Sequence, residues 1–330
     1  MIRALPDLLS TSLFSRVTSE LRNDLDRAAL EAVTGTRSDI TAATNGRNGQ
    51  VHRAQMAIDQ SQATQTRLAL ITGRYNQSAV SLQTVREAVN NKGVEAMQAA
   101  TANDRAGLVA SANTANSTLG VIFSALNNRF DGRALFAGDA AATDALGDLD
   151  TMKADISAIV TGAGTPADKR AAIDAYFGPG GTFETTIYKG GSNDAAKVTL
   201  PNGYDVPALQ RADSTTLRDM MKGLTMVANA IKLPPQDIVD WVRQGADLIR
   251  SSQDELAIAE AELGDSLNRI DEAAEKEKAD YRIASETLDR IIGRDAFEAA
   301  TETQNLEIRL EAAYTLTSRL GRLSLTNYLR

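Results

Sequence analysis

Apolar residues recur at alternating spacings of three and four over long stretches at both ends of this chain. Such a repeat keeps one face of a helix apolar along its length and predicts helices that pack lengthwise on partner helices. It indicates helices near residues 8–34, 51–91 and 108–126, and a long helix after Pro234 and Pro235 with a heptad repeat from Ile249 to Ile270. The two repeats between residues 68 and 126 predict an antiparallel helical pair.

The middle of the chain has a different character, because glycine and proline are frequent between residues 139 and 214. Turns should dominate there, with short elements between them. Short helices are expected at residues 148–160 and 166–177, and short strands at residues 182–188, 196–200 and 204–209.

These patterns predict a mainly α fold. Both chain ends should form a long antiparallel helical bundle or coiled coil, with a small α+β domain inserted in the middle. The expected division is a terminal helical polymerisation layer of residues 1–40 and 293–330, a long-helix core of residues 41–138 and 215–292, and an outward-facing inserted domain of residues 139–214.

Composition narrows the range of functions. The formal net charge is -8, and no cluster of lysine and arginine is present, which argues against a nucleic-acid partner. Cysteine is absent and His52 is the one histidine, so neither a thiolate site nor a His-rich metal site is expected. No apolar run is long enough for a membrane span, and the first residues lack the core of a cleaved signal peptide.

We therefore expect neither an enzyme nor a cofactor. The glycine-rich run at residues 178–181 lacks the Lys-Ser/Thr pair of a phosphate loop. The acidic stretch at residues 271–280 has lysines interleaved, which favours a solvated helix face over a cation site.

The apolar stripes at the extreme ends of the chain are the candidate site. They have no third element nearby in sequence to cover them, and isolated helices of this kind are marginal in water. Burial between copies would compensate for the entropy lost on ordering them. The predicted subunit-interface residues are Leu13, Val17, Leu21, Leu25, Leu306, Leu310, Leu316, Leu320, Leu323, Leu325, Tyr328 and Leu329.

Four short segments carry a family resemblance. The ending Leu323-Ser324-Leu325-Thr326-Asn327-Tyr328-Leu329 resembles the end of flagellins and, more closely, of flagellar hook-associated protein type 3. Three other segments resemble flagellin elements in the same order along the chain. They are the turn at residues 30–37, the Leu-Gln-Thr-Val-Arg-Glu segment at residues 82–87, and the Gly-Arg-Ala-Leu-Phe-Ala-Gly segment at residues 132–138.

The resemblance implies a structural component of the bacterial flagellum, a junction protein that connects the hook to the flagellin filament. Its implied partners are copies of itself, a second hook-associated protein on the hook side, flagellin on the filament side and an export chaperone. It also implies an extracellular location, reached without a cleaved signal peptide. Two alternatives stay open: the filament flagellin itself, and a cytoplasmic coiled-coil adaptor with no link to flagella.

Overall fold

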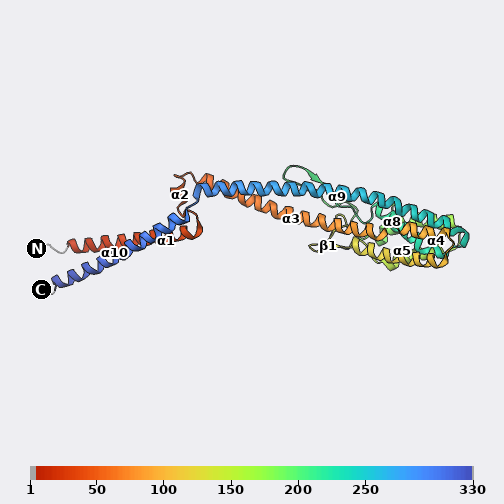
Figure 1. The fold of residues 1–330 in the computed structure, drawn as a ribbon, viewed down its shortest axis with the longest axis horizontal. Helices are drawn as coiled ribbons and strands as arrows, with labels where there is room; N and C mark the ends of the chain where they lie inside the picture. The colour runs from red at the N-terminus through yellow and green to blue at the C-terminus, as the bar shows by residue number, and fades with distance from the viewer. Residues whose placement is uncertain (1–4, 329–330) are drawn as a thin grey trace. The chain divides into compact units, whose positions relative to one another are not determined.

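The computed structural model describes residues 5–328, and side chains are described for residues 12–319. The chain forms two compact units (Figure 1). Unit 1 consists of Met1–Gln65 and Glu277–Arg330, and unit 2 consists of Thr66–Lys276. Two long helices, α3 (Gly49–Val89) and α9 (Pro235–Ile292), contribute residues to both units.

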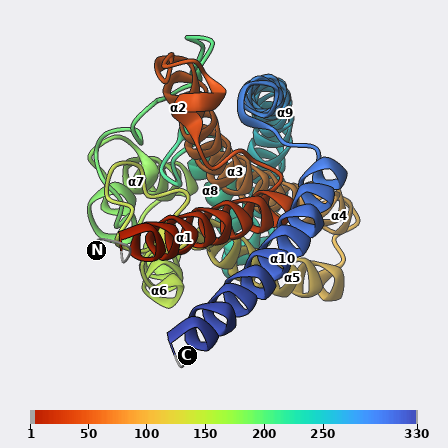
Figure 2. The same cartoon turned by 90° about the vertical axis from the view of Figure 1, so that its left-hand side faces the viewer.

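Unit 1 is built around the two terminal helices, α1 (Leu5–Thr34) and α10 (Ala296–Tyr328), which pack on each other as an antiparallel pair. Figures 1 and 2 both show them in contact near the C-terminus of α1 and separating toward Leu5 and Tyr328. The short helix α2 (Ile40–Ala43) follows α1. The start of α3 and the end of α9 complete the unit.

Unit 2 consists mainly of helices that close around one hydrophobic core. Leu68, Leu119 and Leu256 represent three of the predicted repeats, and all three are fully buried. Helix α5 (Arg105–Leu126) packs against α4 (Lys92–Thr101) and α8 (Thr215–Asn229). Arg86 on α3 pairs with Glu260 on α9 at 2.7 Å. The predicted mainly α fold of packed long helices is confirmed. The 3-10 turn Ala230–Lys232 follows α8 and also packs against α5.

The middle segment contains two of its predicted helices and two of its predicted strands. Helices α6 (Leu149–Thr161) and α7 (Pro166–Phe177) lie where they were expected. Strand β3 (Val198–Thr199) pairs antiparallel with β4 (Asp205–Val206), with Val198 opposite Val206. Most buried apolar residues of this segment belong to the same hydrophobic cluster as the long helices of unit 2. The three-part domain division stays a prediction.

The strand predicted at residues 182–188 is wrong, because a π-helical turn, Phe183–Ile187, occupies this place. The Tyr188 amide donates to the Phe183 carbonyl at 2.8 Å, which closes the turn. Phe183 and Ile187 are buried, and a spacing of four places two residues on one face in a helix as well as in a strand. Periodicity alone therefore could not separate the two structures.

Besides the short helix α2, helix α4 and a hairpin of two strands were not predicted. Helix α4 begins directly after Asn91, which adopts a left-handed conformation with φ of 60°. Asparagine tolerates this region better than most residues, so the chain reverses and starts a new helix where only a break was expected. In the hairpin, β1 (Arg129–Phe130) pairs with β2 (Arg133–Ala134).

Candidate assembly surface on the terminal helices

In unit 1, a short backbone bridge joins the segment that follows α1 to the segment that precedes α10. Helix α1 ends at Thr34, and the next residue, Gly35, has a φ of +67°, which glycine adopts readily and which suits a helix C-terminus. Thr36 then forms an isolated antiparallel bridge with Gly293, just before α10. The Arg37 amide donates to the Ile292 carbonyl at 2.7 Å, and the Arg294 amide donates to the Gly35 carbonyl at 2.8 Å.

A charged cluster surrounds this bridge. Glu31 is a buried carboxylate on α1, and one of its oxygens accepts a hydrogen bond from the Ser38 amide at 2.8 Å. Its other oxygen lies 3.8 Å from Nε of Arg294, which also pairs with Glu302 on α10. Because the Glu31 and Arg294 side chains are largely shielded from solvent, we infer that this cluster fixes the base of the helix pair. We call residues 31–38 and 292–302 the base.

The seam between α1 and α10 is covered next to the base. Ala28 on α1 and Leu306 on α10 are buried, and Leu21, Leu25 and Leu310 are half-buried. The antiparallel course brings these residues of the two predicted stripes to the same stretch of the pair. Within unit 1, the two ends of the chain therefore cover part of each other.

The same stripes are exposed farther from the base. Leu13 is 57% exposed, Val17 is 45% exposed and Leu316 is 52% exposed. Near this point a polar contact spans the seam, because Arg22 donates to the Tyr314 hydroxyl at 3.1 Å. The helices separate toward this end (Figure 1), where Leu13 and Val17 are exposed, whereas Leu21 and Leu25 nearer the base are half-buried. We call Leu13, Val17 and Leu316 the open seam.

The other predicted interface residues lie outside the described side chains. Leu320, Leu323, Leu325 and Tyr328 fall within helix α10, but their side chains are not described, and Leu329 lies outside the described residues altogether.

A second group of exposed apolar residues was not predicted from the sequence. Val33 is 87% exposed and Phe297 is 83% exposed. They lie three residues before Thr36 and four residues after Gly293, so both flank the bridge at the base. Ile308 is also exposed and lies three helical turns beyond Phe297, on the face of α10 opposite Leu306. The sequence contained a signal for this second group, because these apolar residues lie outside the apolar stripes predicted for the two terminal helices.

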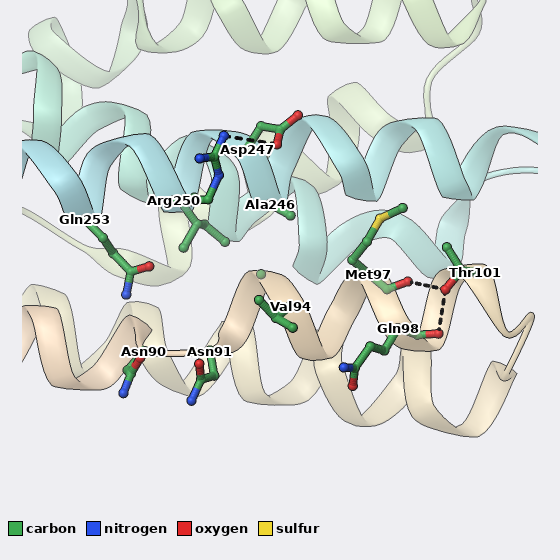
Figure 3. A pocket seen from close by; sticks show the side chains of 12 residues that line it. Asn90, Asn91, Val94, Met97, Gln98, Thr101, Ala246, Asp247, Arg250 and Gln253 are labelled. Atoms are coloured by element: carbon green, nitrogen blue, oxygen red, sulfur yellow. Dashed lines mark hydrogen bonds and ion pairs between the residues drawn. The ribbon is translucent and has the colours of Figure 1, made fainter.

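Unit 2 contains a cleft between α4 and α9 of about 340 Å³ (Figure 3). Its floor includes Gly93, Val94 and Met97, and its charged lining residues are Asp247 and Arg250, which pair with each other at 3.9 Å. This lining holds no nucleophile with an adjacent base, which an acyl- or group-transfer site needs. The cleft therefore offers shape and apolar surface but no catalytic set.

The remaining described residues give no other candidate centre. No group of three or more histidine, cysteine, aspartate or glutamate side chains is placed to hold a metal ion in the described part of the chain. Among the described helices, none has an apolar stretch long enough to cross a lipid bilayer. The terminal helix pair is thus the feature that most needs a functional explanation.

Comparison with known proteins connects the C-terminal part of the chain to one family. Residues 247–329 match the family model described as the bacterial flagellin C-terminal helical region. This match covers most of α9 and all of α10, and it bears out the flagellin resemblance of the C-terminus. A comparison with curated protein sequences finds no match.

Two solved structures are similar in part. A crystal structure of FlgL from Bacillus cereus is 17% identical, with a TM-score of 0.41 over 72% of this chain and 98% of that one. A structure described as a flagellar hook-associated protein from Vibrio parahaemolyticus is 17% identical, with a TM-score of 0.49 over 72% of this chain and 92% of that one.

Proposed function

We propose that this chain, whose residues 247–329 match the flagellin C-terminal helical region, is a structural subunit of the bacterial flagellum. Its specific role is that of a junction protein, which connects the hook to the flagellin filament through packing of its terminal helices. It carries out no reaction and needs no cofactor in this role.

The open seam carries the proposal. Three large apolar side chains at the far end of the terminal pair remain about half exposed, although the same stripes are covered near the base. Full burial of one such side chain is worth roughly 1.5–3 kcal/mol. A neighbouring helix that completes the seam therefore gains burial that the isolated subunit lacks.

The magnitudes favour an assembly of several copies over a simple pair. Covering the remaining half of three side chains offers a total of roughly 2–5 kcal/mol. Association costs about 4–15 kcal/mol of translational and rotational freedom. One such contact is therefore weak, and a stable assembly requires each copy to contact more than one neighbour, as in a closed ring or a polymer.

The partners follow from this role. Copies of the chain lie beside one another, a second hook-associated protein binds on the hook side, and flagellin binds on the filament side. An export chaperone holds the subunit before secretion. The location is extracellular, at the hook-filament junction, and is reached without a cleaved signal peptide.

A deletion strain tests the role. Cells without the protein should assemble hooks but release flagellin monomers into the medium, and immunolabelling of wild-type flagella should mark the far end of the hook. Label along the whole filament, together with growth of micrometre filaments from purified protein, would instead identify the filament flagellin. Protein found only in the cytosol of motile cells would indicate a cytoplasmic adaptor.

A pair of substitutions tests the surface. Leu316→Asp, alone or with Leu13→Asp, should leave the secreted subunit helical and soluble while preventing its incorporation, because a charge cannot be buried in an apolar seam. Ile258→Asp is the matched control, since Ile258 is also an exposed aliphatic residue but lies in unit 2. Equal loss of incorporation in the control, or normal incorporation of Leu316→Asp, would contradict the proposed surface.

A further inference from the structure

A groove of about 470 Å³ runs along α10 in unit 1. It begins at Phe297 in the base and ends at Arg309, about three helical turns farther on, and residues of α10 line it. Leu316 lies eleven residues after Asn305, which also lines the groove. Because eleven residues complete about three helical turns, the groove runs in line with Leu316 and is continuous with the open seam.

Phe297 forms an exposed wall of this groove. Its side chain is 83% exposed and lies two residues before Ala299, which is fully buried. Two residues correspond to about 200° around a helix, so Phe297 points away from the buried face of α10. Exposed aromatic side chains of this kind are frequent anchors in protein interfaces.

Helix α1 has an exposed apolar face of its own at the same end of the pair. Leu30 is 55% exposed and Val33 is 87% exposed. They follow the buried Ala28 by two and five residues, which places them about 200° and 140° around the helix from it. We call Leu30 and Val33 the outer face of α1. Val33 and Phe297 both flank the backbone bridge, so this outer face and the start of the groove lie equally close to the base.

Exposed charges beside these two surfaces follow opposite orders. Along the groove, Glu298 lies in the base and Arg309 lies at the far end. On the other side of the pair, Arg37 lies in the base, and Asp26 lies farther away, one heptad before Val33. If two copies stand side by side with their bases level, α1 of one runs antiparallel to α10 of the other. Each charge then comes beside one of the opposite sign, which favours this register over others.

We propose that the groove on α10 binds the outer face of α1 from a second copy, so that Phe297 contacts Leu30 and Val33 of its neighbour. This contact rests on the proposed function, in which the open seam alone is too small and each copy needs more than one neighbour. Because two different surfaces meet, each copy uses its groove on one side and its outer face on the other. Such a contact continues from copy to copy, as a ring or a polymer requires.

Engineered cysteines test the contact, because the chain contains none of its own. Two full-length variants, Val33→Cys and Thr301→Cys, are mixed and treated with a short thiol crosslinker; Thr301 lines the groove and is exposed. The mixture should form dimers about ten-fold faster than either variant alone, because the contact raises the effective concentration of one thiol near the other. Ile258→Cys mixed with Val33→Cys gives the rate of random collision, since Ile258 is exposed in unit 2.

Two outcomes of this experiment would overturn the proposal. Dimers that form in the mixture no faster than in the Ile258→Cys control would mean that the two surfaces do not meet. Dimers of Val33→Cys alone that form as fast as in the mixture would mean that equal faces pair about a two-fold axis.

A charge in the groove gives a second test. Phe297→Asp, added to Thr301→Cys, should slow crosslinking to Val33→Cys about ten-fold, because a charge is not buried in an apolar contact without a partner. Circular dichroism should not change, since Phe297 is exposed. Ile258→Asp in the same background is the matched control, and an equal effect of both changes would contradict the proposal. If Phe297→Asp loses helix, the crosslinking rates of the single cysteine variants decide.

The deletion strain separates a failure of this contact from a failure of the proposed function. If crosslinking stays at the control rate while the strain releases flagellin monomers, the junction role holds and this contact is wrong. If crosslinking succeeds while the strain assembles normal flagella, copies associate through this contact but the junction role is wrong.

Discussion

The terminal helices of unit 1 and the long helices of unit 2 carry the same kind of apolar repeat, but they differ in how completely it is covered. Leu68, Leu119 and Leu256 in unit 2 are fully buried, whereas Leu13 and Leu316 in unit 1 are more than half exposed. Helix α5 has neighbours in α4, α6 and α8, while α1 packs along α10. The comparison teaches that spacing determines which face of a helix is apolar, and that the number of neighbouring helices determines whether this face is buried.

The largest expected effect is on a covered repeat. Leu256→Ala should lower the free energy of unfolding of unit 2 by about 2–5 kcal/mol, because it removes a fully buried side chain and leaves a cavity. The single tryptophan, Trp241, is fully buried in the same core, so urea unfolding followed by its fluorescence reports on this unit. A decrease in the free energy of unfolding of less than about 0.5 kcal/mol is typical of a surface substitution. Such a result would contradict the claim that the repeat is covered in unit 2 and exposed in unit 1.

A pair of glycines in α9 tests close packing in the same way. A Cβ added at Gly245 would lie 3.0 Å from the Gly223 carbonyl oxygen on α8, whereas one added at Gly264 would have no atom within 4 Å. Gly245→Ala should therefore destabilise unit 2 by about 1–3 kcal/mol through overpacking. Gly264→Ala should stabilise it by up to about 1 kcal/mol through helix propensity. Equal effects of the two substitutions would show that α8 and α9 are not in close contact at Gly245.

Alkaline pH should weaken unit 2 through a buried tyrosine. Burial, aided by the nearby Asp213 carboxylate, raises the pKa of Tyr188 from its ordinary value of 10 to about 12. The unfolded chain then loses this proton at lower pH than the folded chain, so the stabilisation is complete below pH 10 and falls as the pH rises to about 12. Tyr188→Phe should make the urea midpoint, followed by circular dichroism, less sensitive to pH in this window. If the substitution left the pH dependence of the urea midpoint unchanged, Tyr188 would have to be exposed to solvent in the folded chain.

The smallest expected effect completes the comparison. Leu316→Ala makes the same chemical change as Leu256→Ala, also within a helix, but in the open seam. It should alter the stability of the isolated chain by no more than about 0.5 kcal/mol, as measured by hydrogen exchange in peptides of α10. A loss comparable to that of Leu256→Ala would mean that Leu316 is already covered in the free subunit, and the driving force for assembly would disappear.

The sequence was sufficient to predict the long helices, because a sustained repeat is a strong indicator of element type. The breaks at Gly35 and Pro234 also appear where the predicted helices end and begin. Short elements were harder to predict. Phe183 and Ile187 satisfy two periodicities at once, and the restart of a helix after Asn91 depends on one left-handed residue.

The candidate site was predictable only in part. The stripes identified the apolar faces of α1 and α10, but not the point at which the helices stop covering each other, since this depends on the distance between two segments far apart in sequence. The exposed residues Val33 and Phe297 were not recognised, although both are apolar residues that stand outside the predicted stripes.

The divergence of α1 and α10 has a practical consequence for anyone who wishes to observe this protein in cells. Because α1 begins and α10 ends at the open-seam end of the pair, a fluorescent or affinity tag fused near either end would lie beside the residues that neighbouring copies contact in the proposed assembly. The exposed turn at residues 201–203, between β3 and β4, is a better point of insertion. A label placed there would report on the subunit without competing for its contacts.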